Sequence, residues 1–435
     1  MPKYCLVEKI LCVAIPRGVN HQSMKLLCLS NGHGEDVIAV QIIRQLQLHP
    51  QAPDIAALPL VGEGYAYRNL GIPIIAPVQS MPSGGFIYMD GRQLGRDLRG
   101  GLLQLTWAQY QAVRKWGNSP GEGKILAVGD IVPLLFAWLS GVEYGFVGTA
   151  RSEYYLRDEG GWLPQTSRWE RWMGSAYHPL DRWLMSRPRC QGVFPRDTLT
   201  TKILQQWSIP AFDLGNPMMD GIGERKIAAR DNDSPLTILL LPGSRTPEAE
   251  QNWQQILKAI AEILHTFKDR SVLFLGAIAP SLNLEPFQES LVGYGWKGIP
   301  QCTFQTPIQD REALAFTQLN GSFLLSQNSY RDCLQAADFA IAMAGTATEQ
   351  FAGLGKPIIT MPGDGPQFTY RFAEAQTRLL GASVVLVKQP RDVAGAIKTL
   401  LFDPDRLQLI ARNGKRRMGE PGAAKRIAQK LKQFS

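Results

Sequence analysis

The chain has 435 residues, of which 45% are hydrophobic and 19% charged, as is typical of a globular chain with about two domains. Lys and Arg (46) outnumber Asp and Glu (38), and the net charge of +8 favours acidic partners: nucleotide phosphates, nucleic acid or an anionic membrane face. The six Cys contain no C-x-x-C pair, which argues against a disulfide framework or a zinc site and indicates a reducing compartment.

The first 23 residues do not resemble a secretory signal. An apolar stretch at 11–15 ends at Pro16-Arg17, and no convincing cleavage site of small residues follows it. We expect residues 1–23 to be a disordered extension, or a mis-assigned start before Met24. No run of the chain reaches the 18 or so uncharged apolar residues of a spanning helix. We expect a cytoplasmic protein, with peripheral association at the inner face of a membrane as a further possibility.

The first half of the chain alternates between strand and helix patterns. Apolar runs predict strands at 25–30, 55–60, 72–77, 124–128 and 144–149, and apolar residues at helical spacing predict a helix at 37–48. Such alternation is typical of parallel βαβ units. We therefore predict a first Rossmann-like domain at 24–220.

A glycine-rich turn follows the first of these strands. It reads Ser-Asn-Gly-His-Gly-Glu-Asp at 30–36, and we expect its polar side chains to point into a cleft. The turn matches the dinucleotide fingerprint only in part, because Val37 replaces the third glycine, and NAD is therefore disfavoured. The alternative is an ordinary glycine-assisted turn in which Asp36 caps the following helix.

Two segments of this half combine basic and large apolar residues. The first is 84–116, and the second is 152–190, which holds four of the ten Trp (162, 169, 172 and 183). Such mixtures suit a membrane interface, where aromatic and long basic side chains span the boundary between lipid and water. A buried amphipathic helix followed by an irregular loop explains them equally well.

A polar stretch at 224–234 separates this half from a second αβ series. Strands are predicted at 236–241, 271–275, 321–325, 338–343, 357–361 and 383–387, with helices at 248–267, 330–336, 346–354 and 370–379. We assign 221–400 to a second Rossmann-like domain. The basic, helical tail at 401–435, broken at Pro421-Gly422, is expected to pack back towards the first domain. The predicted fold class is α/β, with two Rossmann-like domains facing a cleft.

Two loops of the second domain have the composition of a diphosphate site. One reads Leu-Pro-Gly-Ser-Arg at 241–245 and the other Ala-Gly-Thr-Ala-Thr at 344–348, and each lies between a strand and a helix. Backbone N–H groups at a helix start, a hydroxyl and an arginine fork all suit a pyrophosphate. The alternative for the second loop is an ordinary buried turn whose small residues serve helix–sheet packing.

These motifs, taken in order, resemble glycosyltransferases of the GT-B type, and most closely the lipid-A-disaccharide synthases. Leu-Pro-Gly-Ser-Arg-x-x-Glu-x-Glu at 241–250, the segment 209–220, the run 344–348 and Pro-Gly-Ala-Ala at 421–424 carry the resemblance. It covers about residues 24–430, patchily in 80–190. The resemblance implies a hexosyltransferase that uses a UDP-sugar held by the C-terminal domain and a lipid or lipid-linked acceptor held by the N-terminal one. It implies neither a metal nor a cofactor.

The resemblance also implies roles for particular residues. Asp130 lies where the family has a catalytic aspartate, although a carboxylate after a strand is also a common helix cap. The candidates are, for catalysis, Asp130, His33 and Asp36; for the donor, Gly243, Ser244, Arg245, Gly345, Thr346, Glu349, Gln350 and Gln367; and for the acceptor loop, Gly32, Gly34, Glu35 and Asn216. His33 and Glu35 are further candidates for the base, and Asn216 stands in place of a family histidine.

The sequence departs from the family at the ribose contact. Seven residues before Pro357 the family usually carries a glutamate, whereas this chain has Gln350, with Glu349 one position earlier and about 100° round a helix. Either Gln350 makes a neutral contact, or the turn presents Glu349. Because the segments at 84–116 and 152–190 also look unlike the synthase, the acceptor is left open.

The sequence is also compatible with other functions. A nucleotide-sugar 2-epimerase shares the fold, and a non-catalytic binder of sugar nucleotides or lipid would need the same pocket. The basic charge fits a nucleic-acid binder, but no module for that partner is recognisable, so none is expected. Asp231-Asn232-Asp233 and Asp403-Pro404-Asp405 are interpreted as solvated turns and not as metal ligands. A homodimer is compatible with the sequence.

Overall fold

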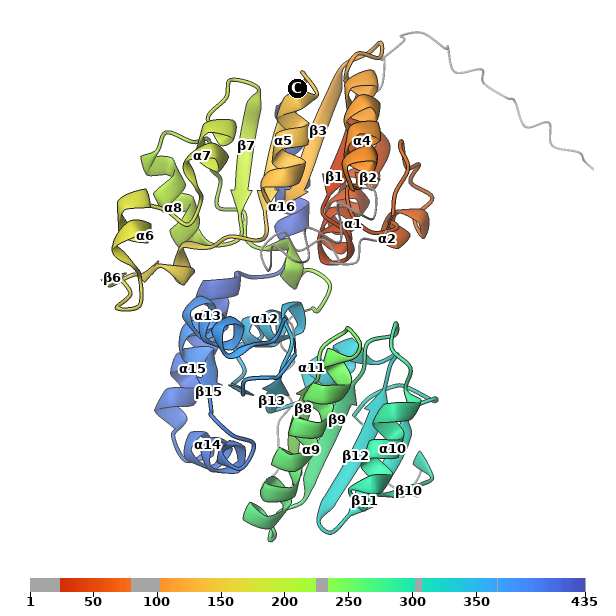
Figure 1. Ribbon diagram of the computed structural model, residues 1–435, viewed down its shortest axis with the longest axis vertical. Helices are drawn as coiled ribbons and strands as arrows, with labels where there is room; N and C mark the ends of the chain where they lie inside the picture. The colour runs from red at the N-terminus through yellow and green to blue at the C-terminus, as the bar shows by residue number, and fades with distance from the viewer. Residues whose placement is uncertain (1–23, 80–101, 224–233, 302–306, 366, 435) are drawn as a thin grey trace, which may run out of the picture.

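The computed structural model describes residues 24–79, 102–223, 234–301, 307–365 and 367–434. It is an α/β structure with two Rossmann-like domains facing one another, as the sequence predicted (Figure 1). The expectations for residues 1–23, for 84–101 of the first basic and apolar segment, for most of the linker and for 231–233 lie outside the described residues. No helix in the described part of the chain is long and apolar enough to cross a bilayer.

The N-terminal domain is built on a five-stranded parallel sheet in the order β2-β1-β3-β4-β7. Alternate residues of β1 serve opposite layers: Leu26 and Cys28 pack with one set of helices, and Leu27 and Leu29 with the other. The strands are β1 (Lys25–Ser30), β2 (Asp54–Pro59), β3 (Gly123–Gly129), β4 (Glu143–Gly148) and β7 (Cys190–Pro195). One face of the sheet is covered by α1 (His33–Gln47) and α2 (Tyr65–Arg68). The other face is covered by α4 (Leu102–Gly117), α5 (Ile131–Leu139), α7 (Pro179–Met185) and α8 (Thr198–Gln206).

The strand predicted at 72–77 is wrong. This segment makes only an isolated parallel bridge, between Ala57 and Ile74, at the edge of the sheet. Pro73 and Pro77 have no N–H to donate, so a continuous ladder of hydrogen bonds cannot form there.

The C-terminal domain has an eight-stranded sheet in the order β10-β11-β12-β9-β8-β13-β14-β15. Six strands are parallel, and β10 and β11, which the sequence did not predict, add an antiparallel edge. The strands are β8 (Leu236–Leu241), β9 (Val272–Ala277), β10 (Lys297–Ile299), β11 (Leu314–Gln318), β12 (Gly321–Ser326), β13 (Phe339–Ala342), β14 (Ile358–Thr360) and β15 (Val384–Leu386); the helices are α9 (Glu248–Thr266), α10 (Glu285–Gly293), α11 (Tyr330–Ala336), α12 (Thr346–Gly353), α13 (Tyr370–Leu380), α14 (Asp392–Leu401) and α15 (Pro404–Met418).

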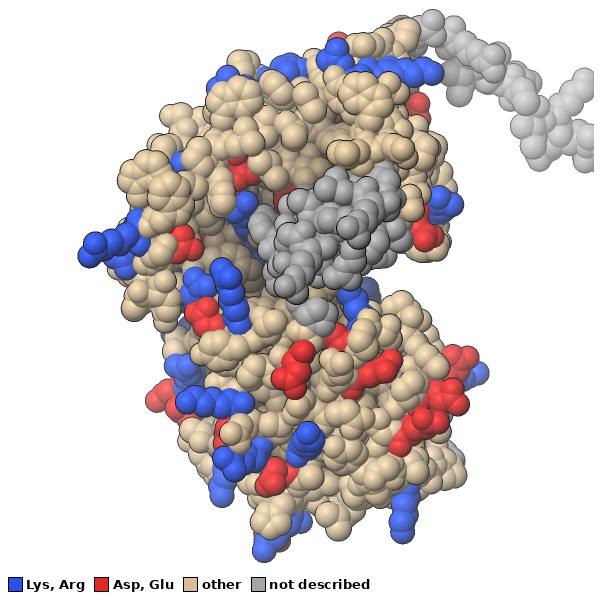
Figure 2. All heavy atoms as spheres, in the orientation of Figure 1, with Lys and Arg blue, Asp and Glu red and all other residues tan. Residues whose placement is uncertain are grey.

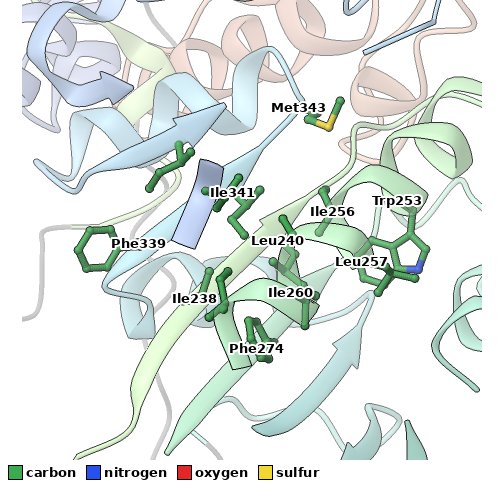
Figure 3. Close-up of a cluster of buried hydrophobic side chains, with 14 of the residues drawn as sticks. Ile238, Leu240, Trp253, Ile256, Leu257, Ile260, Phe274, Phe339, Ile341 and Met343 are labelled. Carbon is green, nitrogen blue, oxygen red and sulfur yellow. The ribbon is translucent and has the colours of Figure 1, made fainter. Parts of the chain in front are cut away.

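The largest core of this domain lies between the sheet and α9 (Figure 3). Ile238 and Leu240 of β8 point to this face, where Trp253 of α9 is 1% exposed and meets Phe287 edge to face. The intervening residues, Leu239 and Leu241, belong to the core on the other face. A strand buried on both faces reads as a continuous apolar run, which explains why the sequence located β8 without error.

The end of the chain returns to the N-terminal domain. Helix α15 packs on the C-terminal domain, whereas α16 (Ala423–Lys432) packs against α1, and its Ile427 is buried in the N-terminal core (Figure 1). The carboxylate of Asp220 accepts hydrogen bonds from three backbone N–H groups that begin α16, those of Gly422, Ala423 and Ala424. A carboxylate at a helix N-terminus is a favourable partner for the helix dipole.

Each sheet has a switch point, where the strand order reverses direction. In the N-terminal sheet it lies between β1 and β3, and in the C-terminal sheet between β8 and β13. Ligands of open parallel sheets bind outside the carboxyl ends of the strands at such points. The loops after β1, β3, β8 and β13 are therefore where a site is expected.

Candidate functional site

The loop after β8 places an arginine at the start of α9. Gly243 has φ +108°, a conformation that favours glycine, and lets the chain turn before Ser244, which is exposed, and Arg245, which is half-buried. The Arg245 guanidinium donates to Oε1 of Gln367, and the Glu248 carboxylate accepts from the backbone N–H of Gln367 at 2.9 Å. The structure thus brings Arg245 and Gln367 together, although the sequence separates them by 122 residues.

The loop after β13 begins α12 at Gly345, which has no side chain, and leaves Thr346 exposed. Backbone carbonyls of this loop and of the β8 loop accept hydrogen bonds from buried side-chain amides of the same domain. Nε2 of Gln376 donates to the carbonyls of Ala344 (3.0 Å) and Gly345 (3.4 Å), and Nδ2 of Asn252 donates to those of Pro242 (2.9 Å) and Met343 (3.4 Å).

Gln376 and Asn252 are 3% and 1% exposed, so these amides are fixed parts of the domain. By occupying the carbonyls of both loops, they leave the loop N–H groups as the polar atoms for a ligand, which is the arrangement that binds phosphates. Sequence reasoning missed both residues, because Gln376 is 32 residues from Ala344 and Asn252 is 91 residues from Met343.

The predicted turn after β1 is in fact the first turn of a helix. We expected α1 to begin at residue 37, whereas it begins at His33, directly after Gly32 with φ +108°. A Cβ at Gly32 would lie 2.5 Å from the carbonyl oxygen of Val61, so this position requires glycine. Acidic residues in a first helical turn are stabilised by the helix dipole, which explains the early start. Of His33, the structure describes the backbone alone.

Asp36 does not face the cleft. Its carboxylate is 2% exposed and accepts a hydrogen bond of 2.6 Å from Ser30 Oγ, which in turn lies 2.7 Å from the hydroxyl of Tyr67. These contacts turn Asp36 into the N-terminal domain, away from an incoming substrate. They favour a structural role over the catalytic one that we predicted.

Asp130 makes the contact of a helix cap. Its Oδ1 accepts from the backbone N–H of Val132 at 2.8 Å at the start of α5, and the residue is 6% exposed. This is the alternative that the sequence left open for Asp130. The assignment of Asp130 as the catalytic base stays a prediction, and one of its oxygens is already occupied.

Glu35 is the carboxylate of this turn that lies between the two domains. Thr149, which follows β4, donates to its Oε1 at 3.3 Å. The pKa of Glu35 is raised to about 7, mainly by burial and also by the nearby carboxylates of Asp130 and Asp36, against hydrogen bonds from its own backbone N–H and from Thr149 that lower it. Across the domain boundary, Glu35 is close enough to Arg245 to stabilise the charge of that guanidinium.

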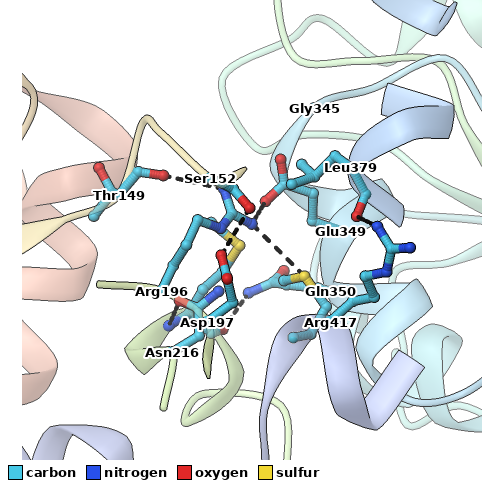
Figure 4. Close-up of polar contacts among 12 residues, drawn as sticks. Thr149, Ser152, Arg196, Asp197, Asn216, Gly345, Glu349, Gln350, Leu379 and Arg417 are labelled. Atoms are coloured by element: carbon cyan, nitrogen blue, oxygen red, sulfur yellow. Dashed lines mark hydrogen bonds and ion pairs between the residues drawn. The ribbon is translucent and has the colours of Figure 1, made fainter. Parts of the chain in front are cut away.

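The two candidate ribose residues both contact the other domain (Figure 4). Glu349 forms an ion pair with Arg196, which follows β7 and is 4% exposed. Gln350 accepts from the hydroxyl of Tyr330 at 2.6 Å and donates to the carbonyl of Met218 at 2.9 Å. These two α12 side chains therefore hold the domains together. The polar groups of both Glu349 and Gln350 are already engaged with protein partners.

Arg196 was missed by the sequence analysis. Burial lowers the pKa of Arg196, but the carboxylate of Glu349 more than offsets this and raises it above its ordinary value. A second bond runs from Arg196 to the carbonyl of Thr149 at 3.0 Å. Its place directly after the apolar run that forms β7 was the available signal, since the carboxyl ends of parallel strands line the cleft.

Asn216 is part of the connection between the domains and not of the acceptor loop. It is 2% exposed, begins a short 3-10 helix (Pro217–Met219), and its Oδ1 accepts from the N–H of Met218 at 3.1 Å. The chain crosses near this point a second time, at Gly419. Gly34 does lie at the cleft, because a Cβ there would come within 4.0 Å of Thr346 Oγ1.

A prediction follows for the ion pair between Arg196 and Glu349. Replacing Arg196 by Ala should cost about 3 kcal/mol, because removal of one partner leaves a buried charge uncompensated. The loss is measured as a fall in thermal unfolding temperature, and a larger radius of gyration in small-angle scattering would report separated domains. Adding Glu349→Gln to the same chain should recover part of the loss.

The matched control is Arg416→Ala, which removes a second ion pair. Arg416 contacts Glu159 at 3.4 Å, and both side chains are about half exposed (50% and 44%), so less than about 1 kcal/mol is expected. Equal losses in the two variants would contradict a special role for Arg196.

Within the described residues, no three His, Cys, Asp or Glu side chains are grouped so that they could hold a metal ion. Asp403 caps α15 by accepting from the N–H of Arg406 at 2.8 Å, as a turn residue would.

Comparison with known proteins finds similarity of structure only. No family model matches the chain, and no curated protein matches its sequence. The calicheamicin glycosyltransferase CalG4 matches with a TM-score of 0.57 and 13% identity over 95% of this chain and 98% of its own. MurG of Acinetobacter baumannii matches with 0.55 and 13% over 94% and 99%. The UDP-GlcNAc 2-epimerase of Neisseria meningitidis, bound to UDP-GlcNAc, matches with 0.54 and 15% over 94% and 100%.

These matches cover nearly the whole of both chains, so the GT-B type of fold is confirmed. Glycosyltransferases and 2-epimerases match equally well, and at such low identity the likeness supports the fold and leaves the reaction open. The resemblance to lipid-A-disaccharide synthases is supported at the level of this shared fold.

Proposed function

We propose that this protein is a glycosyltransferase that moves a sugar from a nucleotide-diphosphate sugar, most simply a UDP-sugar, to a lipid or lipid-linked acceptor. The observation that carries the proposal is the pair of loops at the switch point of the C-terminal domain. There Arg245, Gln367 and the open start of α12 meet, with the loop carbonyls held by Asn252 and Gln376. UDP is preferred as the nucleotide because of the motif resemblance, and the epimerase bound to UDP-GlcNAc supports it.

The chemistry of such a site follows from charge. When the bond between the anomeric carbon and the diphosphate oxygen breaks, negative charge develops on the diphosphate. The Arg245 guanidinium and the N-terminus of α12 can stabilise that charge without moving, which is how preorganised sites lower a barrier. The N-terminal loops after β1 and β3 stand opposite and would position the acceptor hydroxyl.

The test is a donor screen. The purified protein is incubated with UDP-sugars and a lipid extract, and products are identified by mass spectrometry while UDP release is followed. UDP release that requires the extract supports the transferase. Conversion of the donor sugar with no acceptor present would favour the epimerase, and UDP binding without turnover would indicate a non-catalytic binder.

The 2-epimerase is the second candidate because its known structures match as well as the transferases do. Conversion at C2 of a sugar needs acid and base groups on both faces of the ring. Among the described residues of the cleft, Asp36 is turned inward and Asp130 caps α5, which leaves Glu35 as the best-placed carboxylate. A transferase needs one general base, which Glu35 can supply.

A surface of the N-terminal domain supports a lipid-phase acceptor. Helix α6 (Arg168–Met173) presents Trp169 and Trp172, 65% and 73% exposed, with stacked rings 4.8 Å apart. Nearby, Trp183 and Trp207 are 41% and 48% exposed, and each stacks with an arginine. Exposed aromatic rings beside arginines suit the headgroup region of an anionic membrane.

Figure 2 shows the charge distribution on one face of the molecule. Basic side chains lie along the upper edge and left flank of the N-terminal domain and over the left and lower parts of the C-terminal domain, and acidic ones gather on the right flank of the C-terminal domain. The basic side chains of the upper edge and left flank would favour contact with an anionic surface. Association with the inner face of a membrane, a cytoplasmic location and a homodimer stay predictions.

The membrane proposal yields a direct measurement. Replacing Trp169 and Trp172 together by Ser should reduce binding to vesicles of phosphatidylglycerol and phosphatidylcholine at least tenfold in a flotation assay, because the two rings supply the apolar contact. Phe402→Ser is the control, since Phe402 is 78% exposed on the other domain. Equal binding by both variants would contradict this surface as the docking site.

A further inference from the structure

The carboxylates nearest the cleft of the N-terminal domain belong to the first turn of α1 and the start of α5. Consecutive helical residues point about 100° apart. For that reason Asp36 turns inward to Ser30, and Glu35, one residue earlier, turns to Thr149 after β4. The early start of α1 at His33 is what separates the two acidic residues in this way.

Glu35 lies where the two switch points meet. Gly34, its neighbour, approaches Thr346 of α12. Across the domain boundary, the negative charge of Glu35 stabilises the charged guanidinium of Arg245, which lies in the β8 loop. The donor diphosphate is expected on the Arg245 side of the cleft and the acceptor on the α1 side. A group at Glu35 would therefore stand beside the acceptor oxygen, on the face turned to the donor.

We propose that Glu35 is the general base that takes the proton of the acceptor hydroxyl, in place of the Asp130 that the sequence resemblance suggested. This inference rests on the proposed glycosyl transfer. Asp130 is less suited, because its Oδ1 is engaged with the N–H of Val132 at 2.8 Å. Glu35 accepts hydrogen bonds from the Thr149 hydroxyl at 3.3 Å and from its own backbone N–H, and unlike Asp130 it lies within electrostatic reach of Arg245 on the donor side of the cleft.

The surroundings of Glu35 give it the proton affinity that the role needs. Its pKa is raised to about 7, mainly by burial; the carboxylates of Asp130, at the β3–α5 junction, and Asp36, on α1, add to the rise, and hydrogen bonds from its own backbone N–H and from the Thr149 hydroxyl oppose it. Arg245 is the cation that faces it from the C-terminal domain. A base whose pKa lies near the working pH is both ionised and able to accept a proton.

The proposed step moves one proton and one glycosyl group. The acceptor O–H proton passes to a carboxylate oxygen of Glu35 as the acceptor oxygen bonds to the anomeric carbon. The bond from that carbon to the diphosphate oxygen breaks, and its electron pair leaves with the nucleoside diphosphate, which gains one negative charge beside Arg245. Glu35 then releases its proton to solvent, so no co-reactant is consumed.

The test compares Glu35→Gln with Asp130→Asn in the full chain, using the donor and acceptor that the screen identifies. Glu35→Gln should lower kcat by about 100- to 1,000-fold, within the range of general-base catalysis, while UDP affinity changes less than about twofold. In the wild type, kcat/KM should fall as the pH drops below about 7, because the protonated carboxyl cannot accept a proton. Asp130→Asn should lose less than about tenfold and keep this acidic limb.

The possible results distinguish a failure of the Glu35 assignment from a failure of the proposed glycosyl transfer. A wild-type chain that releases no UDP with any donor and extract refutes the proposed function and this inference with it. UDP release that Glu35→Gln retains, or a lost acidic limb in Asp130→Asn alone, refutes the role of Glu35 and leaves the transferase standing. Infrared difference spectra of wild type against Glu35→Gln give a readout without turnover, since one carboxyl should titrate near pH 7; titration near 4.5 would also overturn the assignment.

Discussion

Replacing Arg245 by Ala should weaken UDP binding about 100-fold. The guanidinium lies at the start of α9, beside Gln367 and opposite the open start of α12, where a diphosphate would receive two parallel hydrogen bonds from it. Hydrogen bonds to charged groups contribute about 1.5–3 kcal/mol, and about 1.4 kcal/mol corresponds to a tenfold change in affinity. Isothermal titration calorimetry with UDP measures the effect directly.

Two further variants make this prediction specific. Arg245→Lys should retain part of the affinity, because a lysine keeps the charge and loses the planar fork. Arg391→Ala is the matched control, since Arg391 is exposed at the start of α14, far from both loops in the sequence, and should bind UDP as the wild type does. Unchanged UDP affinity in Arg245→Ala would count against the whole donor-site assignment.

Replacing Lys356 by Met should destabilise the C-terminal domain by about 3 kcal/mol or more. Lys356 is 5% exposed, and its Nζ donates to the carbonyls of Leu334 (2.8 Å), Gln335 (2.6 Å) and Ala337 (2.7 Å) at the end of α11. Met fills a similar volume but donates no hydrogen bond. Each buried carbonyl left without a donor costs about 1–3 kcal/mol, and the positive charge at the helix C-terminus is lost as well.

The measurement is guanidinium unfolding followed by far-ultraviolet circular dichroism. Lys398→Met serves as the control, because Lys398 is exposed near the end of α14 and should change stability by less than about 0.5 kcal/mol. A Lys356→Met chain as stable as this control would show that other donors can satisfy the three carbonyls.

Most strands were predictable because they are buried on both faces or carry a strict pattern. β8 is a continuous apolar run, and its alternate residues serve two cores. The edge of each sheet was harder: 72–77 looked like a strand but its prolines prevent pairing, and the short β10 was overlooked. An edge strand has a neighbouring strand on one side only, so its apolar pattern is weaker. Whether it pairs then depends on which of its residues have a backbone N–H to donate.

The loops of the candidate site could be picked out in the sequence, but the contacts that hold them could not. Loops at the ends of β8 and β13 carry Gly243, Arg245 and Gly345 in recognisable motifs. Arg196 and Glu349, in contrast, are 153 residues apart, and Asn252 and Gln376 act on loops they do not belong to. Contacts between distant segments leave no local pattern of spacing from which they could be inferred.

The sequence by itself determined the α/β class, the two Rossmann-like domains and the glycine-containing loops at strand ends, because periodicity and glycine at strand ends are local consequences of backbone geometry. Only the tertiary structure decided which side chains face the cleft. It turned Asp36 inward and Glu35 outward by starting α1 at His33, and it engaged Glu349 and Gln350 with the opposite domain. The physical reason is that a side chain's direction depends on the register of its helix and on the partners packed against it, which only the folded chain brings together.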